Sequence, residues 1–240
     1  MTGKLYGVGI GPGDPELITI KAKRILSEAE VIAFPKTALE KASLAWSIAA
    51  DQGVGGKEQL ELLFPMSSDQ KVLRESWNAA AGRIREKLEE GKRVAFITLG
   101  DPTVYSTYMY IHQQLVATGY AAEIIPGVPS FCAAAAKAGI SLAENRETVA
   151  ILPSADQPNS LAGVLSSFDN IVLMKVSRDW AGLKAVLKAE GLLETAVLAS
   201  RCGMEGERIT THLEAVDEAD LSYFTTVIVK KAGVRGVKEP

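Results

Sequence analysis

Cysteine and histidine are scarce in this sequence, with two of each among its 240 residues. Cys132 and Cys202 stand seventy positions apart, and neither belongs to a C-x-x-C motif. A disulfide framework needs a larger set of cysteines, and a zinc site needs a cluster of cysteine and histidine ligands. We therefore expect neither a disulfide scaffold nor a metal ion held by the protein's own side chains.

Excess positive charge and long apolar runs are also lacking. The formal net charge is −3, which argues against the basic surface that binds nucleic acid. The start, MTGKLYGVGIG, lacks the apolar segment of a signal peptide, and the apolar stretch from Pro129 to Ile140 is interrupted by Lys137 and too short to span a bilayer. We expect a cytoplasmic protein that binds neither nucleic acid nor a membrane.

Short apolar runs bounded by turn residues alternate with helical patterns along the chain, which is typical of an α/β fold with mostly parallel strands. The predicted strands are Leu5–Gly9, Val31–Phe34, Leu60–Phe64, Val94–Thr98, Glu123–Ile125, Val149–Leu152, Ile171–Lys175, Ala196–Ser200 and Phe224–Val229. The predicted helices are Glu16–Ser27, Lys41–Asp51, Asp69–Glu90, Val104–Thr118, Pro129–Ala138, Ser160–Ser167 and Trp180–Glu190. A boundary is expected near Gly119–Ala122, giving domains 1–119 and 120–240 of ordinary size.

The first loop with candidate chemistry is GVGIGPGDPEL, directly after the first predicted strand. A dinucleotide fingerprint needs G-x-G-x-x-G, but its third glycine would fall on Pro12 or Asp14, and no G-K-[ST] of a P-loop follows. What remains is a proline-stiffened turn whose backbone can approach a ligand, with Asp14 as the cap of the helix that Pro15 begins. A tight βα turn without a ligand is the alternative.

Two further loops follow predicted strands in the same way. TLGDPTVYST begins at Thr98, where Pro102 favours an extended Asp101 that presents its backbone and carboxylate to a crevice. IIPGVPSF begins at Ile124 and leads into Cys132 and four alanines, which either pack a helix closely on a sheet or leave room for a flat ligand. Helix capping and core packing are the alternatives for these two loops.

In this order and spacing, GxGPGDPELxTxKA, LGDPxxYST and IIPGVxSF resemble the tetrapyrrole methylase family, which methylates precursors of siroheme and cobalamin. The resemblance covers nearly the whole chain. Within the family, FPMS from Phe64, FITLGD from Phe96, VLMKV from Val172 and YFTT from Tyr223 resemble the branch that methylates C-20. The sequence is more similar to the enzymes that act on the cobalt-containing substrate, cobalt-factor II (cobalt-precorrin-2), than to those for metal-free precorrin-2.

The resemblance implies two αβα domains with an active-site cleft between them, a homodimer, and S-adenosylmethionine as methyl donor, with cobalt present only as part of the substrate. By motif, the residues implied to bind the donor are Pro12, Leu99, Gly100, Asp101, Val104, Tyr105, Pro129, Ser130, Met174, Lys175 and Gly203. Pro129 departs from the family, where a serine or threonine is common at this position, so one hydroxyl contact is missing.

The implied reaction is an in-line displacement of methyl from a sulfonium, for which alignment supplies most of the catalysis. We find no nucleophilic triad and no carboxylate pair, and we assign no catalytic base. The carboxylates of the substrate favour basic partners at strand ends, and Lys36, Lys175, Arg178 and Arg201 are the candidates. We expect His112 at the surface, and His212 is a weaker candidate to approach a substrate cobalt.

Several alternatives stay open at this level. The same methylation chemistry could act on metal-free precorrin-2, on another ring position of a tetrapyrrole, or on the modified histidine that the diphthamide branch of the family methylates. Outside this chemistry, a non-catalytic nucleotide-binding protein could share the same α/β architecture, because a fold does not fix a function.

Overall fold

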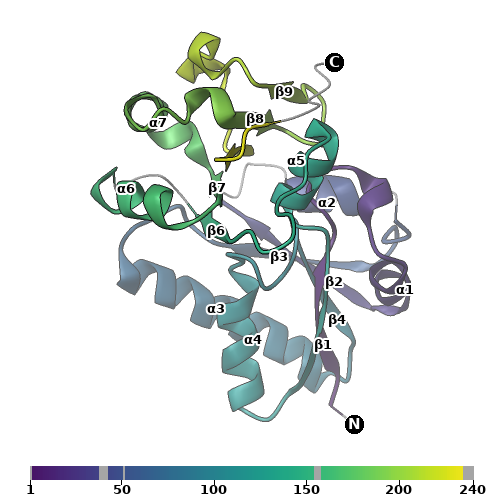
Figure 1. Cartoon of the computed structure of the whole chain (residues 1–240). Helices are drawn as coiled ribbons and strands as arrows, with labels where there is room; N and C mark the ends of the chain where they lie inside the picture. The colour runs from purple at the N-terminus through teal and green to yellow at the C-terminus, as the bar shows by residue number, and fades with distance from the viewer. Residues whose placement is uncertain (1, 38–42, 51, 154–157, 235–240) are drawn as a thin grey trace. The chain divides into compact units, whose positions relative to one another are not determined.

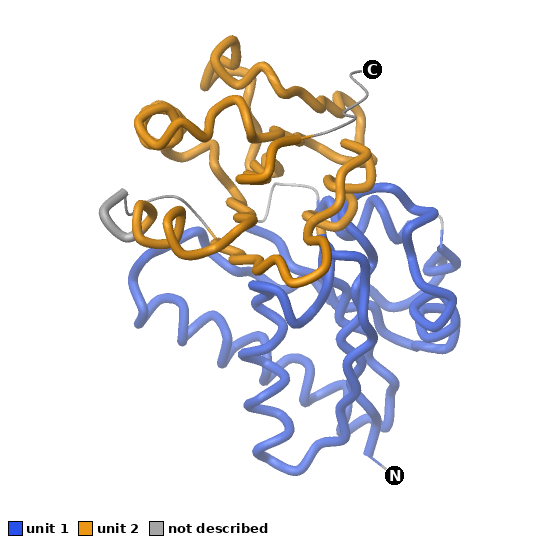
Figure 2. Tube along the Cα trace, in the orientation of Figure 1, with its two compact units in different colours: residues 1–129 blue, residues 130–240 orange. Residues whose placement is uncertain are grey.

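The structure is a computed structural model that describes residues 2–37, 43–50, 52–153 and 158–234. The chain divides into two compact units, residues 1–129 and 130–240 (Figure 2). The division falls after residue 129 and not after 119, because β5 (Ala121–Ile125) pairs with β1 (Lys4–Gly9) and so belongs to the first unit.

The first unit contains a parallel five-stranded sheet in the order β3-β2-β4-β1-β5. Its remaining strands are β2 (Val31–Lys36), β3 (Glu58–Leu63) and β4 (Val94–Thr98). β4 is buried along its whole length, as expected for a strand covered on both faces. Because β1 lies between β4 and β5, the carboxyl ends of these three strands are neighbours, and the three candidate loops begin there.

Helices cover both faces of this sheet (Figure 1). Apolar residues of α3 (Gln70–Glu89) and α4 (Tyr108–Ala117) pack on one face, where Phe96 and Leu5 are buried. α1 (Ile20–Glu28) and α2 (Leu44–Ala49) pack on the other face against Val8 and Ile97. The first unit is therefore an αβα sandwich, as the sequence predicts.

Local sequence explains where these helices begin. Asp69 caps α3, because its side-chain Oδ1 accepts a hydrogen bond from Lys71 N at 2.7 Å. Asp14 caps only a short 3₁₀ turn, Pro15–Leu17, and α1 starts at Ile20, where Thr19 is the cap. α4 begins at Tyr108 and not at Val104, because Tyr105 has a φ of +48° that a helix cannot contain. The predicted helix Lys41–Asp51 is confirmed over Leu44–Ala49, while residues 41, 42 and 51 lie outside the described residues.

The second unit has a mixed sheet in the order β6-β7-β10-β8-β9. β6 (Val149–Leu152) and β7 (Asn170–Met174) pair in parallel, whereas β10 (Thr225–Lys230) is antiparallel to β7 and β8 (Ala196–Ser200), and β9 (Arg208–Thr210) is antiparallel to β8. The parallel arrangement that alternating strands and helices predict is thus confirmed for the first sheet and holds only for one pair in the second. The three-residue β9 was not predicted.

Helices also lie on both faces of the second sheet. α6 (Pro158–Ser167) and α7 (Trp180–Ala189) contribute Leu165 and Trp180 to a core with β7, β8 and β10. α5 (Ser130–Ala138) contacts β8 and β10 through buried alanines. Short 3₁₀ turns complete the unit at Val176–Arg178, Leu193–Thr195, Leu213–Ala215 and Glu218–Asp220.

Candidate functional site

The first two candidate loops are hydrogen-bonded to each other at the ends of β1 and β4. Ile10 N donates to Thr98 O at 3.1 Å, and Gly100 N donates to Gly11 O at 2.8 Å. Gly11 and Gly100 form an isolated antiparallel bridge, and the φ of +65° at Gly100 favours glycine there. The parallel strands therefore continue into two loops that run as one paired element.

Three glycines, one from each loop, lie in backbone contact. A Cβ atom built on Gly9 would lie 2.7 Å from both Gly100 O and Gly127 N, and one built on Gly127 would lie 2.2 Å from Gly100 O. Real Cβ atoms do not approach so closely. The sequence suggests glycine for close approach of backbone to a ligand, but at these positions glycine permits close approach of the loops to one another.

The carboxylate of Asp101 joins the second loop to the third. Its Oδ1 accepts hydrogen bonds from Thr103 N at 2.8 Å and Thr103 Oγ1 at 2.5 Å, and its Oδ2 accepts one from Gly127 N at 2.9 Å. The side chain is buried, with 8% of the residue exposed. Asp101 was expected to present its carboxylate to a crevice, and the structure instead directs the carboxylate to backbone and hydroxyl groups of the same unit.

Apolar and aromatic side chains of the second loop remain accessible beside this backbone. Leu99 and Val104 are half-buried, and Tyr105 is 49% exposed with a φ of +48°. A non-glycine residue in the left-handed region is uncommon and is often found at a functional site. Pro12, by contrast, is buried, so it shapes the first loop more than it offers contact area.

A buried tyrosine lies beneath the first loop. The Tyr108 ring would be 2.1 Å from a Cβ on Gly7, which explains the glycine at that position. The Tyr108 hydroxyl and His112 Nδ1 are 2.9 Å apart. Burial raises the pKa of Tyr108 and lowers the pKa of His112. His112 is partly buried and hydrogen-bonded, so the expectation of a surface histidine was wrong.

The predicted residues Met174, Lys175 and Arg201 of the second unit lie where β7 and β8 end, at one edge of its sheet. Met174 at the end of β7 pairs with Thr226, and Ser200 at the end of β8 pairs with Thr225, so both strand ends flank the start of β10. The next residue in each case, Lys175 or Arg201, has a left-handed backbone with a φ of +56° or +53°. Two strained positions, one on either side of β10, make this edge a second candidate for ligand contact.

Aromatic side chains lie at the same edge. Tyr223 is 45% exposed and Phe224 is 37% exposed, and their rings meet edge to face at a centroid distance of 5.4 Å. Lys175 Nζ lies 5.2 Å from the centroid of the Tyr223 ring. From the sequence, Tyr223 and Phe224 are part of the YFTT motif, and the predicted strand begins at Phe224, one residue before β10 starts.

Comparison with known proteins identifies the family of this chain. The family described as tetrapyrrole (corrin/porphyrin) methylases matches residues 4–217. The chain belongs to the tetrapyrrole methylase family. It is 39% identical to the cobalt-precorrin-2 C(20)-methyltransferase of Salmonella typhimurium, covering 96% of this chain and 98% of that protein. It is 30% identical to the precorrin-2 C(20)-methyltransferase of a Sinorhizobium species, covering 95% of each.

A solved structure supports the same family. The X-ray structure of a cobalt precorrin-4 methyltransferase, a cobalamin biosynthetic enzyme, matches with a TM-score of 0.72 and 25% identity, covering 95% of each chain. The tetrapyrrole methylase fold that the sequence motifs imply is therefore shown.

The predicted site residues of this tetrapyrrole methylase fall into two groups. The first unit holds Pro12, Lys36, Leu99, Gly100, Asp101, Val104, Tyr105 and Pro129, and the second holds Ser130, Met174, Lys175, Arg178, Arg201 and Gly203. Within the first unit, the structure brings together the loops after β1, β4 and β5. Within the second, it brings together the residues that follow β7 and β8.

Two basic or imidazole candidates are placed less favourably. Lys36 ends β2 and forms a 3.1 Å ion pair with Glu61, with only 11% of its side chain exposed. His212 follows β9, whose Thr210 pairs with Leu198, so it extends toward the start of β8 and away from Ser200. His212 therefore does not share the edge formed by Lys175 and Arg201.

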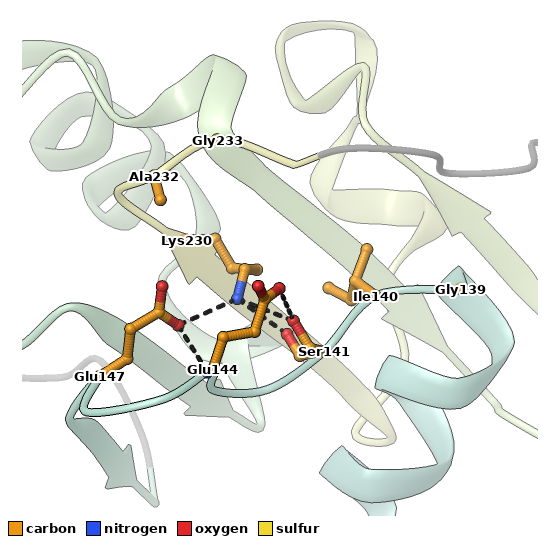
Figure 3. Close-up of a pocket in the computed structure, with 8 residues that line it drawn as sticks. All are labelled: Gly139, Ile140, Ser141, Glu144, Glu147, Lys230, Ala232 and Gly233. Carbon is orange, nitrogen blue, oxygen red and sulfur yellow. Dashed lines mark hydrogen bonds and ion pairs between the residues drawn. The ribbon is translucent and has the colours of Figure 1, made fainter.

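A pocket of about 320 Å³ in the second unit lies at the other end of β10 (Figure 3). Its Lys230 is 4% exposed, and Nζ donates to Ser141 O at 2.9 Å and lies 3.5 Å from a Glu147 carboxylate oxygen. The charge of Lys230 is thus already compensated, and none of the predicted site residues lines this pocket. Its contacts hold the segment after α5 against β10.

Metal-ligand clusters and membrane-spanning helices are both absent from residues 2–37, 43–50, 52–153 and 158–234. No three histidine, cysteine, aspartate or glutamate side chains of the described chain lie together as a metal site would require. Across the same residues, no helix has the length and apolar character needed to cross a membrane.

Proposed function

We propose that this chain transfers a methyl group from S-adenosylmethionine to C-20 of cobalt-factor II (cobalt-precorrin-2) in cobalamin biosynthesis. The observation that carries the proposal is the 39% identity, over nearly the full length of both chains, to a cobalt-precorrin-2 C(20)-methyltransferase. The lower identity of 30% to a precorrin-2 C(20)-methyltransferase favours the cobalt-containing substrate over the metal-free one.

The methyl donor is proposed to bind at the loops of the first unit. Ligands of parallel α/β sheets bind at the carboxyl ends of the strands, which is where these loops begin. Half-buried Leu99 and Val104 and exposed Tyr105 offer apolar and aromatic surface beside strand-end backbone groups. A nucleoside with an amino-acid tail suits that combination of apolar area and a few polar groups.

From the remaining chain, we propose Pro129, Ser130, Met174 and Gly203 as further donor contacts. The strained edge of the second unit is proposed to bind the substrate through Lys175, Arg178 and Arg201. A guanidinium can hold a carboxylate with two parallel hydrogen bonds, and the tetrapyrrole carries several carboxylates at its rim. Lys36 is the weakest of these candidates because Glu61 already neutralises it.

The chemistry asks the protein mainly to align two reactants. A bound donor supplies a methyl group on a positively charged sulfur. When C-20 attacks this methyl group in line, the sulfur is the leaving group and keeps the electrons of the broken bond. Alignment of this kind can lower the activation free energy by about 7–11 kcal/mol. C-20 then loses its proton, and we assign no side chain as the base. On the family resemblance, we also propose a cytoplasmic homodimer.

Two measurements test the proposal. Calorimetric titration with S-adenosylhomocysteine should show saturable binding, and no binding at high micromolar ligand would reject a methyltransferase. Mass spectrometry should then show a gain of one methyl on cobalt-factor II and none on precorrin-2. Methylation of precorrin-2 alone would replace the cobalt substrate with the metal-free one.

A further inference from the structure

Asp101 lies in a loop that we propose to bind the methyl donor, yet its carboxylate is hydrogen-bonded within the protein. Both of its carboxylate oxygens accept hydrogen bonds from the protein, two from Thr103 and one from Gly127. The residue is only 8% exposed. The carboxylate therefore bonds to the loops themselves, and the accessible groups of the second loop include the side chains of Leu99, Val104 and Tyr105.

The bond to Gly127 crosses between two loops that are distant in sequence. Gly127 N donates to Asp101 Oδ2 at 2.9 Å over a separation of 26 positions. A backbone amide bound to a carboxylate is charge-assisted and stronger than a neutral pair. Gly127 of the third loop packs against Gly9 and Gly100, and no side chain fits between these backbones. Asp101 thus joins the second loop to the third at the place where the glycine backbones are in contact.

We propose that Asp101 is a positioning residue, which holds Gly127 and with it the third loop in place for methyl-donor binding and does not grip the donor with its carboxylate. The inference rests on the proposed function, because it needs a ligand at these loops. Its physical basis is that the Asp101 carboxylate is already bonded to Thr103 and Gly127.

The variant Asp101→Asn separates the two roles. The asparagine oxygen can still accept from Thr103, but its amide group would face the Gly127 N–H, and two donors cannot bond to each other. We expect exchange of the Gly127 amide hydrogen, followed by NMR, to accelerate by at least about tenfold. We also expect the dissociation constant for S-adenosylhomocysteine to rise by about tenfold or more, which corresponds to about 1.4 kcal/mol.

Asp69→Asn is the matched control. Asp69 also binds a backbone amide with its carboxylate, that of Lys71 at 2.7 Å, but this bond caps α3 and joins no loops. Both the Gly127 exchange rate and the affinity for S-adenosylhomocysteine should be unchanged in this control. In Asp101→Asn, KM for the methyl donor should rise while kcat at saturating donor is largely retained, since a positioning residue does not touch the reacting atoms.

The outcomes decide between positioning and direct contact. Faster Gly127 exchange together with weaker ligand binding supports positioning. Weaker binding with unchanged Gly127 exchange would overturn it, because the carboxylate would then act on the ligand itself. Unchanged binding with faster exchange would also overturn it, since the third loop would not matter to the ligand. If the unsubstituted protein binds no S-adenosylhomocysteine, the proposed function fails first, which distinguishes the two failures.

Discussion

The substitution Gly127→Ala would place a Cβ atom 2.2 Å from the carbonyl oxygen of Gly100 and 2.8 Å from two backbone atoms of Gly9. Real Cβ atoms essentially never lie closer than 3.0 Å to such atoms. The third loop must therefore move by at least 0.8 Å, the difference between 3.0 and 2.2 Å. All the atoms contacted are backbone, so no flexible side chain can turn away to relieve the clash.

The cost of this movement can be bounded. Forcing extra volume into a packed site costs about 1–3 kcal/mol, and weakening the Gly127–Asp101 hydrogen bond adds to it. We expect urea denaturation, followed by circular dichroism, to show a free energy of unfolding lower by about 1–3 kcal/mol. Affinity for S-adenosylhomocysteine should fall as well, because the loop that moves belongs to the proposed donor site.

Gly82→Ala provides the matched comparison in the same unit. Gly82 lies inside α3, and a Cβ atom there would have nothing within 4 Å. Alanine in an open helical position should raise the free energy of unfolding by about 0.5–1 kcal/mol. The reasoning is refuted if Gly127→Ala is as stable as Gly82→Ala and binds S-adenosylhomocysteine as the unsubstituted protein does.

Three further expectations concern charge. Burial lowers the pKa of His112 below its ordinary 6.5. The unfolded chain therefore binds this proton more readily than the folded one, and the free energy of unfolding falls as the pH drops below about 6.5. In urea denaturation at several pH values, His112→Gln should remove this part of the pH dependence. Lys21 and Lys4 lower the pKa of Glu123 to about 2, so its contribution is complete above about pH 4.5 and is lost as the pH falls toward about 2; Glu123→Gln should flatten acid unfolding in this range. Arg201→Ala should weaken tetrapyrrole binding more than S-adenosylhomocysteine binding in calorimetry, and equal losses would contradict its assignment to the substrate.

Much of the fold follows from local patterns in the sequence. The apolar runs at β4, β6 and β8 are predicted to the residue, since each is short and directly follows a polar residue. β9 escapes prediction because three residues, Arg208–Thr210, carry too little periodicity. The antiparallel direction of β10 also cannot be read locally, because it depends on how the chain returns after the 3₁₀ turns near Leu213 and Glu218.

The candidate site shows the same limit more sharply. The three loops can be located from sequence because each follows an apolar strand. The hydrogen bond between Asp101 and Gly127 cannot, since it requires β5 to lie beside β1 and β1 beside β4. From the sequence alone, without that strand order, the carboxylate of Asp101 is therefore predicted to contact a ligand. The tertiary contact therefore changes the role assigned to a residue whose position was correctly singled out.

The placement of β1 between β4 and β5 also bears on how the protein is made. β1 leaves the ribosome before both of its partners, β4 and β5, which are distant along the chain, with Lys4 paired to residue 121 and Leu5 to Val94. Closing such long loops is slow compared with forming local contacts. A nascent chain that ends before β5 therefore lacks one neighbour of β1 and the third of the three loops. The proposed donor site can form during synthesis only after Gly127 has emerged, so a ligand cannot stabilise the shorter nascent chains.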